Sequence, residues 1–94
     1  MNNNYSYPMF ESWNRDEVLT MMNLYTSVEK AYEDKNGVDK SLIIKLYNNF
    51  RSINPSKMEQ KQLDRDFYQI SGYSLYKTWQ AAKNNKSKNV RMNY

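Results

Sequence analysis

Hydrophobic residues recur every three or four positions along four stretches of this chain, which is the spacing of the buried face of an α-helix. The first stretch starts at "WNRDEV", where Asn14 can cap a helix and Glu17 can complete a capping box. Gly37 follows the last apolar position and can adopt the left-handed conformation that is common at a helix C-terminus. We therefore predict a helix over about 15–35. Its apolar stripe consists of Val18, Met21, Met22, Tyr25, Val28 and Tyr32.

The second stretch predicts a helix over 40–53 that Asp39 can cap. Pro55 ends it, because proline lacks an amide donor and disfavours helical geometry at the preceding residue, Asn54. The buried face of this helix is predicted to contain Leu42, Ile43, Leu46, Tyr47, Phe50 and Ile53.

Two further helices complete the pattern. The sequence "SKME" places Ser56 as the cap of a helix over 57–70, which Gly72 closes. Its expected core positions are Met58, Leu63, Phe67 and Ile70. Ser74 then opens a helix over 75–84. Its expected contacts are Leu75, Tyr76, Trp79 and Ala82.

These elements predict a single all-α domain over residues 1–84, with four helices whose short connections favour packing between neighbours. An extended, aromatic arm over 1–13 precedes the first helix. Residues 85–94 are polar and basic, and we expect them to form a flexible tail. A strand-like alternation of apolar and polar residues in the tail is too short to predict a strand. Its apolar members are Val90, Met92 and Tyr94.

The composition is that of a folded protein without disulfides or a membrane span. Of the 94 residues, 39% are hydrophobic and 15% aromatic, and none is cysteine, so disulfides and thiolate metal sites are excluded. No apolar run approaches the roughly 20 residues that a membrane-spanning helix needs. The N-terminus "MNNNYSYP" lacks the basic and apolar regions of a signal peptide. We therefore expect a cytoplasmic protein.

Several short motifs occur in the same order as in a known protein family. They are "YSYP", the following Trp13, "VEKAYE", "GV", "NPSK", and "SGYS" with a Tyr-Lys pair behind it. Together they resemble a small uncharacterised protein family of Gram-positive bacteria, the YktA-like proteins, over roughly residues 4–83. The resemblance implies an all-helical, compact, cytoplasmic protein. It carries no activity to any residue, and the tail from Asn84 lies outside it.

The inventory of reactive side chains argues against an enzyme. The chain contains no histidine and no cysteine, which removes the usual general base near neutral pH and the thiol nucleophile. Its two glycines, Gly37 and Gly72, are too far apart for a phosphate-binding loop. "DKNGVD" resembles part of a calcium loop, but aligning Gly37 with the central glycine puts Tyr32 and Ile43 where acidic ligands are required. We predict no catalytic activity, no cofactor and no metal.

The net charge of +4 suggests nucleic-acid binding, but the distribution of charge weakens that hypothesis. Residues 85–94 contain three cations and no acid, so residues 1–84 carry eleven Lys and Arg against ten Asp and Glu. The segment "KMEQKQLDRDF", which a helix-turn-helix would use to read DNA, has three cations and three acids. Because phosphate neutralisation supplies much of the affinity for DNA, sequence-specific DNA binding is disfavoured. The cations of the tail are Lys86, Lys88 and Arg91.

The segment "NYSYPMFESW" concentrates aromatic side chains near a chain end. One interpretation is that the arm covers apolar surface of the helices, with Trp13 as its anchor. The other is that the aromatic side chains stay partly exposed and dock a partner, because Tyr and Trp dominate interface hot spots. The predicted partner-binding residues are Tyr5, Tyr7, Phe10, Trp13, Tyr73 and Tyr76. A homodimer formed through this surface would satisfy both interpretations.

We therefore predict a small cytoplasmic helical protein that acts as a non-catalytic protein-interaction or regulatory module. Its partner would be an unidentified protein or a second copy of this chain. The alternative is an accessory nucleic-acid-binding protein that acts through the basic tail, with binding that falls steeply as salt rises. No membrane role is expected, because the chain lacks a strongly basic amphipathic helix.

Overall fold

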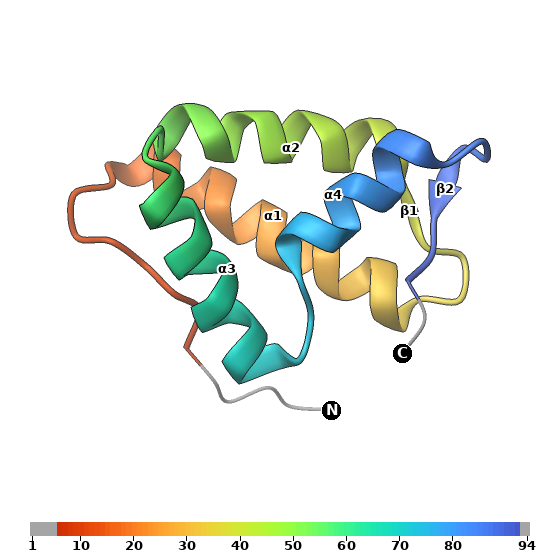
Figure 1. Ribbon diagram of the computed structural model, residues 1–94, viewed down its shortest axis with the longest axis horizontal. Helices are drawn as coiled ribbons and strands as arrows, with labels where there is room; N and C mark the ends of the chain where they lie inside the picture. The colour runs from red at the N-terminus through yellow and green to blue at the C-terminus, as the bar shows by residue number, and fades with distance from the viewer. Residues whose placement is uncertain (1–5, 93–94) are drawn as a thin grey trace.

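Four helices carry the fold in the computed structural model, which describes residues 6–92 (Figure 1). The helices are α1 (Arg15–Glu33), α2 (Lys40–Ile53), α3 (Lys57–Ser71) and α4 (Leu75–Asn84). Two short strands, β1 (Val38–Asp39) and β2 (Asn89–Val90), form an antiparallel pair. The all-α prediction is therefore confirmed. Helices α2 and α4 have their predicted limits, and α1 and α3 end within two residues of theirs.

The helices begin at the predicted capping residues. At α1, the Asn14 side chain accepts a hydrogen bond from the Glu17 amide at 2.8 Å, and the Glu17 carboxylate accepts one from the Asn14 amide at 2.9 Å. This reciprocal capping box satisfies amides that the first turn of a helix leaves without partners. At each of the other three helices, the side chain of the N-cap residue accepts a hydrogen bond from an amide of the first turn. These acceptors are Asp39, Ser56 and Ser74.

The predicted end of α1 at Gly37 is wrong. The helix ends at its C-cap Asp34, whose backbone is extended and whose side chain accepts a hydrogen bond from the Asn36 amide at 2.9 Å. Gly37 lies in the turn before β1 with φ +71°, and a Cβ atom there would lie 2.1 Å from the Val90 carbonyl oxygen. Glycine is therefore needed for close approach to β2. Gly72, with φ +82°, is the C-cap of α3 as predicted.

The core lies around α1, which runs beneath α2 and behind α4 in Figure 1 and packs on both. Its largest fully buried side chains include Tyr25, Phe50, Phe67, Met21, Leu24 and Ile43. Three predicted core or contact positions are exposed instead, Leu42 by 42%, Tyr76 by 46% and Met58 by 80%. At about 100° of rotation per residue, Leu42 lies at the edge of the apolar stripe of α2, and Met58 lies on the side of α3 opposite Leu63 and Phe67.

The described part of the arm packs on the helices. Tyr7 stacks on Tyr25 with ring centroids 5.2 Å apart, and the Tyr25 hydroxyl donates a hydrogen bond to the Pro8 carbonyl at 2.8 Å. Burial raises the pKa of the Tyr25 hydroxyl, because a phenolate there would lose its hydration. Trp13 is buried, and its indole N–H donates to the Asn54 side-chain oxygen at 2.9 Å. The arm is therefore an additional layer of the core, as the first of the two interpretations states.

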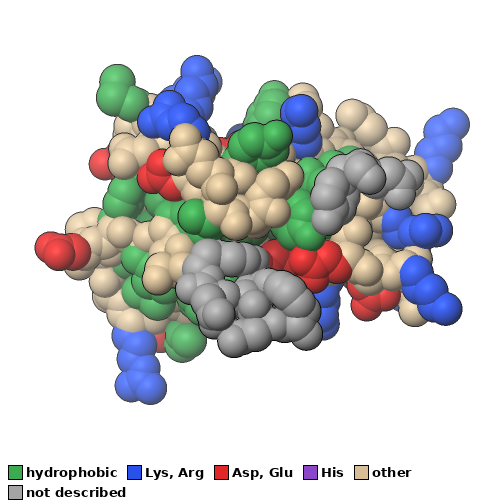
Figure 2. Space-filling view, turned by 90° about the horizontal axis from the view of Figure 1, so that it is seen from below, with side chains coloured by type: hydrophobic (Ala, Val, Ile, Leu, Met, Phe, Trp, Pro, Cys, Tyr) green, Lys and Arg blue, Asp and Glu red, His purple; other side chains and the backbone are tan. Residues whose placement is uncertain are grey.

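The prediction of a flexible tail over 85–94 is corrected by the described part of that segment. Strand β2 pairs with β1 in a register that places Val38 opposite Val90, and Val90 is only 1% exposed. Beyond the strand, the Met92 amide donates a hydrogen bond to the Ala31 carbonyl at 2.7 Å. Backbone pairing and burial of an apolar side chain together offset the entropic cost of ordering this segment. Lys and Arg side chains gather at the end of the molecule that carries β2, on the right in Figure 2.

Candidate functional site

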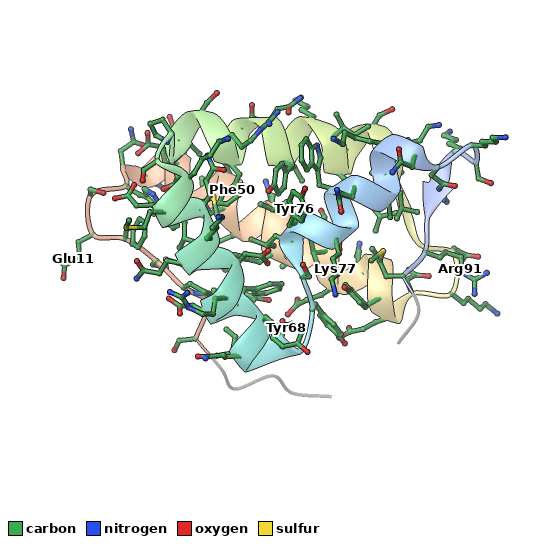
Figure 3. All side chains as sticks on the ribbon, viewed as in Figure 1. Glu11, Phe50, Tyr68, Tyr76, Lys77 and Arg91 are labelled. Carbon is green, nitrogen blue, oxygen red and sulfur yellow. The ribbon has the colours of Figure 1, made fainter. Side chains whose placement is uncertain are left out.

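A groove with a volume of about 910 Å³ lies between the C-terminal half of α2, the outer face of α3 and the start of α4. Figure 3 shows Tyr68 on α3 and the adjacent Tyr76 and Lys77 on α4, all of which line this groove. Its lining includes one acid, Asp64, and several cations. The cations are Arg51, Lys57, Lys61, Arg65 and Lys77. We refer to this site as the α2–α3–α4 groove.

Helix α3 supplies its cations as a stripe along one face. Lys57, Lys61 and Arg65 follow one another at intervals of four residues, and all three are exposed. An interval of four residues rotates each side chain by only about 40° from the previous one. Of the three acids in the same segment, only Asp64 lines the groove. The neutral total charge of this segment therefore conceals a cationic surface.

Helices α2 and α4 supply an aromatic wall. The rings of Tyr47 and Trp79 stack with centroids 4.4 Å apart and an interplanar angle of 9°. The Arg51 guanidinium lies over Trp79, 4.6 Å from its ring centroid, and Nη2 of Arg51 donates a hydrogen bond to the Asn48 side-chain oxygen at 2.8 Å. The Lys83 ammonium lies 3.7 Å from the same centroid. The electron-rich indole thus attracts two cations to the edge of the groove.

Both carboxylate oxygens of Asp64 accept hydrogen bonds from residues at the start of α4. Its Oδ1 accepts a hydrogen bond from the Leu75 amide at 2.7 Å, and its Oδ2 accepts bonds from the Tyr76 amide at 3.3 Å and the Ser74 hydroxyl at 3.5 Å. Burial raises the pKa of the Asp64 carboxyl, while these hydrogen bonds and the charge of Lys77 act in the opposite direction. Asp64 therefore joins α3 to α4, and its oxygens are engaged before any ligand arrives.

The Tyr47 hydroxyl stays neutral at the groove wall. Burial raises the pKa of Tyr47 to about 12, and the nearby Asp64 charge adds to this increase. The positive charge of Arg51 opposes it, because a guanidinium favours a phenolate. Since the hydroxyl is un-ionised near neutral pH, Tyr47 contributes no negative charge to the groove.

The described arm residues that were predicted to bind a partner lie against the body. Tyr5 lies outside the described residues. Tyr7 is partly buried, and its hydroxyl donates a hydrogen bond to the Glu29 carboxylate at 2.8 Å. The partly buried ring of Phe10 lies 5.3 Å from that of Trp13, which is only 8% exposed. Trp13 therefore does not offer the exposed surface that the docking interpretation requires.

The two other predicted partner-binding residues differ from each other. Tyr73 is 5% exposed, stacks on Tyr32 at a centroid distance of 4.3 Å, and donates a hydrogen bond from its hydroxyl to Glu33 at 2.6 Å. Its side chain belongs to the packed body. Tyr76 is 46% exposed and lines the α2–α3–α4 groove, which none of the described arm residues lines. Of the described residues in the prediction, Tyr76 is the one at this site.

Sequence reasoning missed the cations of the groove. The available signal was the four-residue spacing of Lys57, Lys61 and Arg65. On an isolated helix this spacing is equally typical of a solvated face. Arg51 and Lys77 come from other helices, so they join the stripe only once the helices are packed.

The groove is suited to binding anions. Guanidinium and ammonium groups form strong, charge-assisted hydrogen bonds with carboxylates and phosphates. Within residues 6–92, no group of three or more His, Cys, Asp and Glu side chains is placed to hold a metal ion. The same part of the chain contains no helix that is both long and apolar enough to cross a membrane.

Comparison with known proteins identifies relatives along most of the chain. The model of an uncharacterised protein family, UPF0223, matches residues 4–91. A UPF0223 protein of Streptococcus mutans is 45% identical over 83 residues, which cover 88% of each chain. A UPF0223 protein of Oceanobacillus iheyensis is 41% identical over 88 residues, which cover 94% of this chain and 98% of the relative.

These matches confirm the resemblance to a small uncharacterised family of Gram-positive bacteria. They also extend it. The family match continues to residue 91, whereas the motifs ended near residue 83. The extension includes β2, which agrees with the packing of this strand against β1.

Proposed function

This chain belongs to the uncharacterised protein family UPF0223, and we propose that it is a non-catalytic protein-interaction module that binds an acidic segment of another protein. The proposed binding site is the α2–α3–α4 groove. One observation carries the proposal. Three helices contribute five cations to the lining of the groove, and the single lining carboxylate, Asp64, already accepts hydrogen bonds from amides at the start of α4. Such a groove attracts carboxylates by its charge and can hold them by charge-assisted hydrogen bonds.

The aromatic residues of the groove bear on whether it binds a protein segment or a single-stranded nucleic acid. Proteins that bind single strands combine a basic groove with open aromatic faces on which bases stack. Trp79 is already covered by Tyr47, Arg51 and Lys83, whereas the groove-lining Tyr68 and Tyr76 are 58% and 46% exposed. Tyr, Trp and Arg are also the residues most enriched where protein partners bind tightly.

The side chains present support binding better than catalysis. The chain has no histidine or cysteine, so it lacks the commonest general base and the most reactive nucleophile. Ser74 lines the groove, but its hydroxyl oxygen accepts a hydrogen bond from the Lys77 amide at 3.1 Å as the N-cap of α4. We place the module in the cytoplasm, which the absence of cysteine favours.

A binding experiment with two matched variants tests this proposal. The probes are a fluorescein-labelled peptide rich in Glu and Tyr, its Gln-for-Glu counterpart, and an oligothymidine of equal length. The groove variant combines Lys57→Gln, Lys61→Gln and Arg65→Gln. The tail variant combines Lys86→Gln, Lys88→Gln and Arg91→Gln. Each variant removes three positive charges, so a difference between them reports position rather than net charge.

The acidic peptide should bind the wild-type protein, and the groove variant should weaken that binding by about tenfold. The tail variant should bind the peptide as the wild type does, and the Gln counterpart should bind weakly to every protein. Tighter binding of oligothymidine, lost in the tail variant, would instead establish the alternative of nucleic-acid binding through the tail. A dimer that only the groove variant dissociates would identify a second copy as the occupant and overturn the assignment to another protein.

A further inference from the structure

We propose that Arg51 is the specificity-determining residue of the α2–α3–α4 groove and binds one carboxylate of the acidic segment with two parallel hydrogen bonds. This inference rests on the proposed function of the groove. Arg51 is exposed and lines the groove at the C-terminal end of α2. Its planar guanidinium carries five N–H donors in a fixed arrangement that matches the two oxygens of a carboxylate.

The guanidinium is held in place before any ligand binds. It lies 4.6 Å from the ring centroid of Trp79 and 5.8 Å from that of Tyr47. One of its N–H groups is directed to the Asn48 side-chain oxygen at 2.8 Å. These contacts orient the plane of the group and leave further donors for a ligand. A cation that is already oriented loses less conformational entropy on binding.

The orientation of the Arg51 guanidinium is fixed by aromatic side chains that pack on the core. Phe50 is 1% exposed and packs edge-on against Tyr47, with ring centroids 5.0 Å apart and an interplanar angle of 64°. Tyr47 stacks on Trp79, and Trp79 supports Arg51. A continuous series of packed rings therefore connects the guanidinium to the fixed interior of the protein.

The other cations of the groove lack this support. Among the described residues, the cations that lie over aromatic rings are Arg51 and Lys83, and of these two only Arg51 lines the groove. Lysines attract an anion as flexible point charges. Arg65 has the same donor group as Arg51 and also lines the groove, so it provides a matched control.

The test compares Arg51→Lys with Arg65→Lys. The probe is the same fluorescein-labelled peptide, which is rich in both Glu and Tyr. Both variants keep the net charge and replace a guanidinium by an ammonium. Arg51→Lys should weaken peptide binding by about tenfold, because a charge-assisted, two-bond contact is lost. Arg65→Lys should change the affinity by less than about threefold, as is typical of an exposed ion pair.

Three further measurements separate recognition from structure. Asn48→Ala removes the bond that orients the guanidinium without touching the ligand-binding donors, and it should weaken peptide binding to a smaller extent than Arg51→Lys. Peptide binding should also change the tryptophan emission of the wild-type protein, because the ligand acts on the cation above Trp79, and this change should be lost in Arg51→Lys. Thermal unfolding of each variant establishes that the fold is retained.

The outcomes distinguish this inference from the proposed function. If the wild-type protein binds the acidic peptide and Arg51→Lys weakens binding no more than Arg65→Lys, Arg51 does not determine specificity, although the groove still binds acidic segments. If the wild-type protein does not bind the acidic peptide, or if the groove variant binds it as tightly as the wild type does, the proposed function fails. This inference then fails with it. A loss of peptide affinity in Arg51→Lys, with no loss in Arg65→Lys, would support the two-bond contact.

Discussion

The Asp64 side chain on α3 accepts a hydrogen bond from the amide of Leu75, the first residue of α4, at 2.7 Å. Asp64 therefore acts as a second cap for α4, in addition to the hydroxyl of the N-cap Ser74. Because α3 and α4 form two walls of the groove, this bond fixes how the walls meet. Asp64 thus both caps α4 and holds α3 and α4 in the arrangement that forms the groove.

Replacing Asp64 by alanine should destabilise the protein by about 1–3 kcal/mol, because the Leu75 and Tyr76 amides lose their side-chain acceptor. Urea unfolding followed by circular dichroism measures this change. Glu11→Ala is the matched control, since Glu11 is an exposed acid in the arm and points away from the body in Figure 3. Equal stability of the two variants would contradict the capping role of Asp64.

The titration of Asp64 should be visible in the pH dependence of stability. Burial raises the pKa of its carboxyl, so the folded state holds the proton more tightly than the unfolded state. The contribution of Asp64 to the free energy of unfolding should therefore decrease as pH rises from the unfolded value of about 3.9 through the higher folded value. An NMR titration of the Asp64 carboxyl carbon measures the folded pKa directly. A midpoint at or below the unfolded value would show that the hydrogen bonds and the charge of Lys77 outweigh burial, and it would contradict this prediction.

The helices could be predicted from the sequence because their signals are local. The capping box of Asn14 and Glu17 lies within one helical turn, and Ser74 marks the start of α4 in the same way. The apolar stripes then indicate which face of each helix is buried. Met58 was assigned wrongly because it was included for its hydrophobic side chain, although the helical period places it opposite Leu63 and Phe67.

The β1–β2 pair and the groove could not be predicted in the same way, because both depend on segments that are distant in sequence. Val38 and Val90 pair although α2, α3 and α4 lie between them in the sequence, and strands of two residues show no usable periodicity. Gly37 was assigned to a helix end because glycine serves both for left-handed caps and for close backbone approach. Arg51 and Lys77 become part of one site only when α2 and α4 are placed beside α3.

The buried side chain of Asn54 should be important for the attachment of the arm. Asn54 is 2% exposed, accepts a hydrogen bond from the Trp13 indole at 2.9 Å, and donates one to the Phe50 carbonyl at 3.1 Å. Asn54→Ala should lower the free energy of unfolding by about 2–4 kcal/mol, because it leaves a buried donor unsatisfied and removes packed atoms. Hydrogen exchange of the Trp13 indole should accelerate in this variant. The exposed Asn49, on the helix whose C-cap is Asn54, provides the control as Asn49→Ala.

Binding at the groove should depend on ionic strength. Its cations are exposed, so their attraction for an acidic peptide is screened as salt is added. Raising the salt concentration from about 0.05 M to about 0.5 M should weaken peptide binding to the wild-type protein, and the weakening should be smaller for the variant that lacks the three α3 cations. Anisotropy titrations at several salt concentrations provide the measurement. An identical salt dependence in both proteins would show that the α3 cations do not contact the peptide.

The two glycines should respond differently to the same substitution. Both have positive φ values, +71° at Gly37 and +82° at Gly72, so alanine is strained at either position. A Cβ atom at Gly72 would meet open space, whereas one at Gly37 would lie 2.1 Å from the Val90 carbonyl oxygen and so force β2 away from β1. We expect Gly72→Ala to cost about 1 kcal/mol and Gly37→Ala at least about 2 kcal/mol more, with loss of amide protection at Val90. Similar losses in urea unfolding, with β2 still protected in Gly37→Ala, would mean that the turn adapts without releasing the strand.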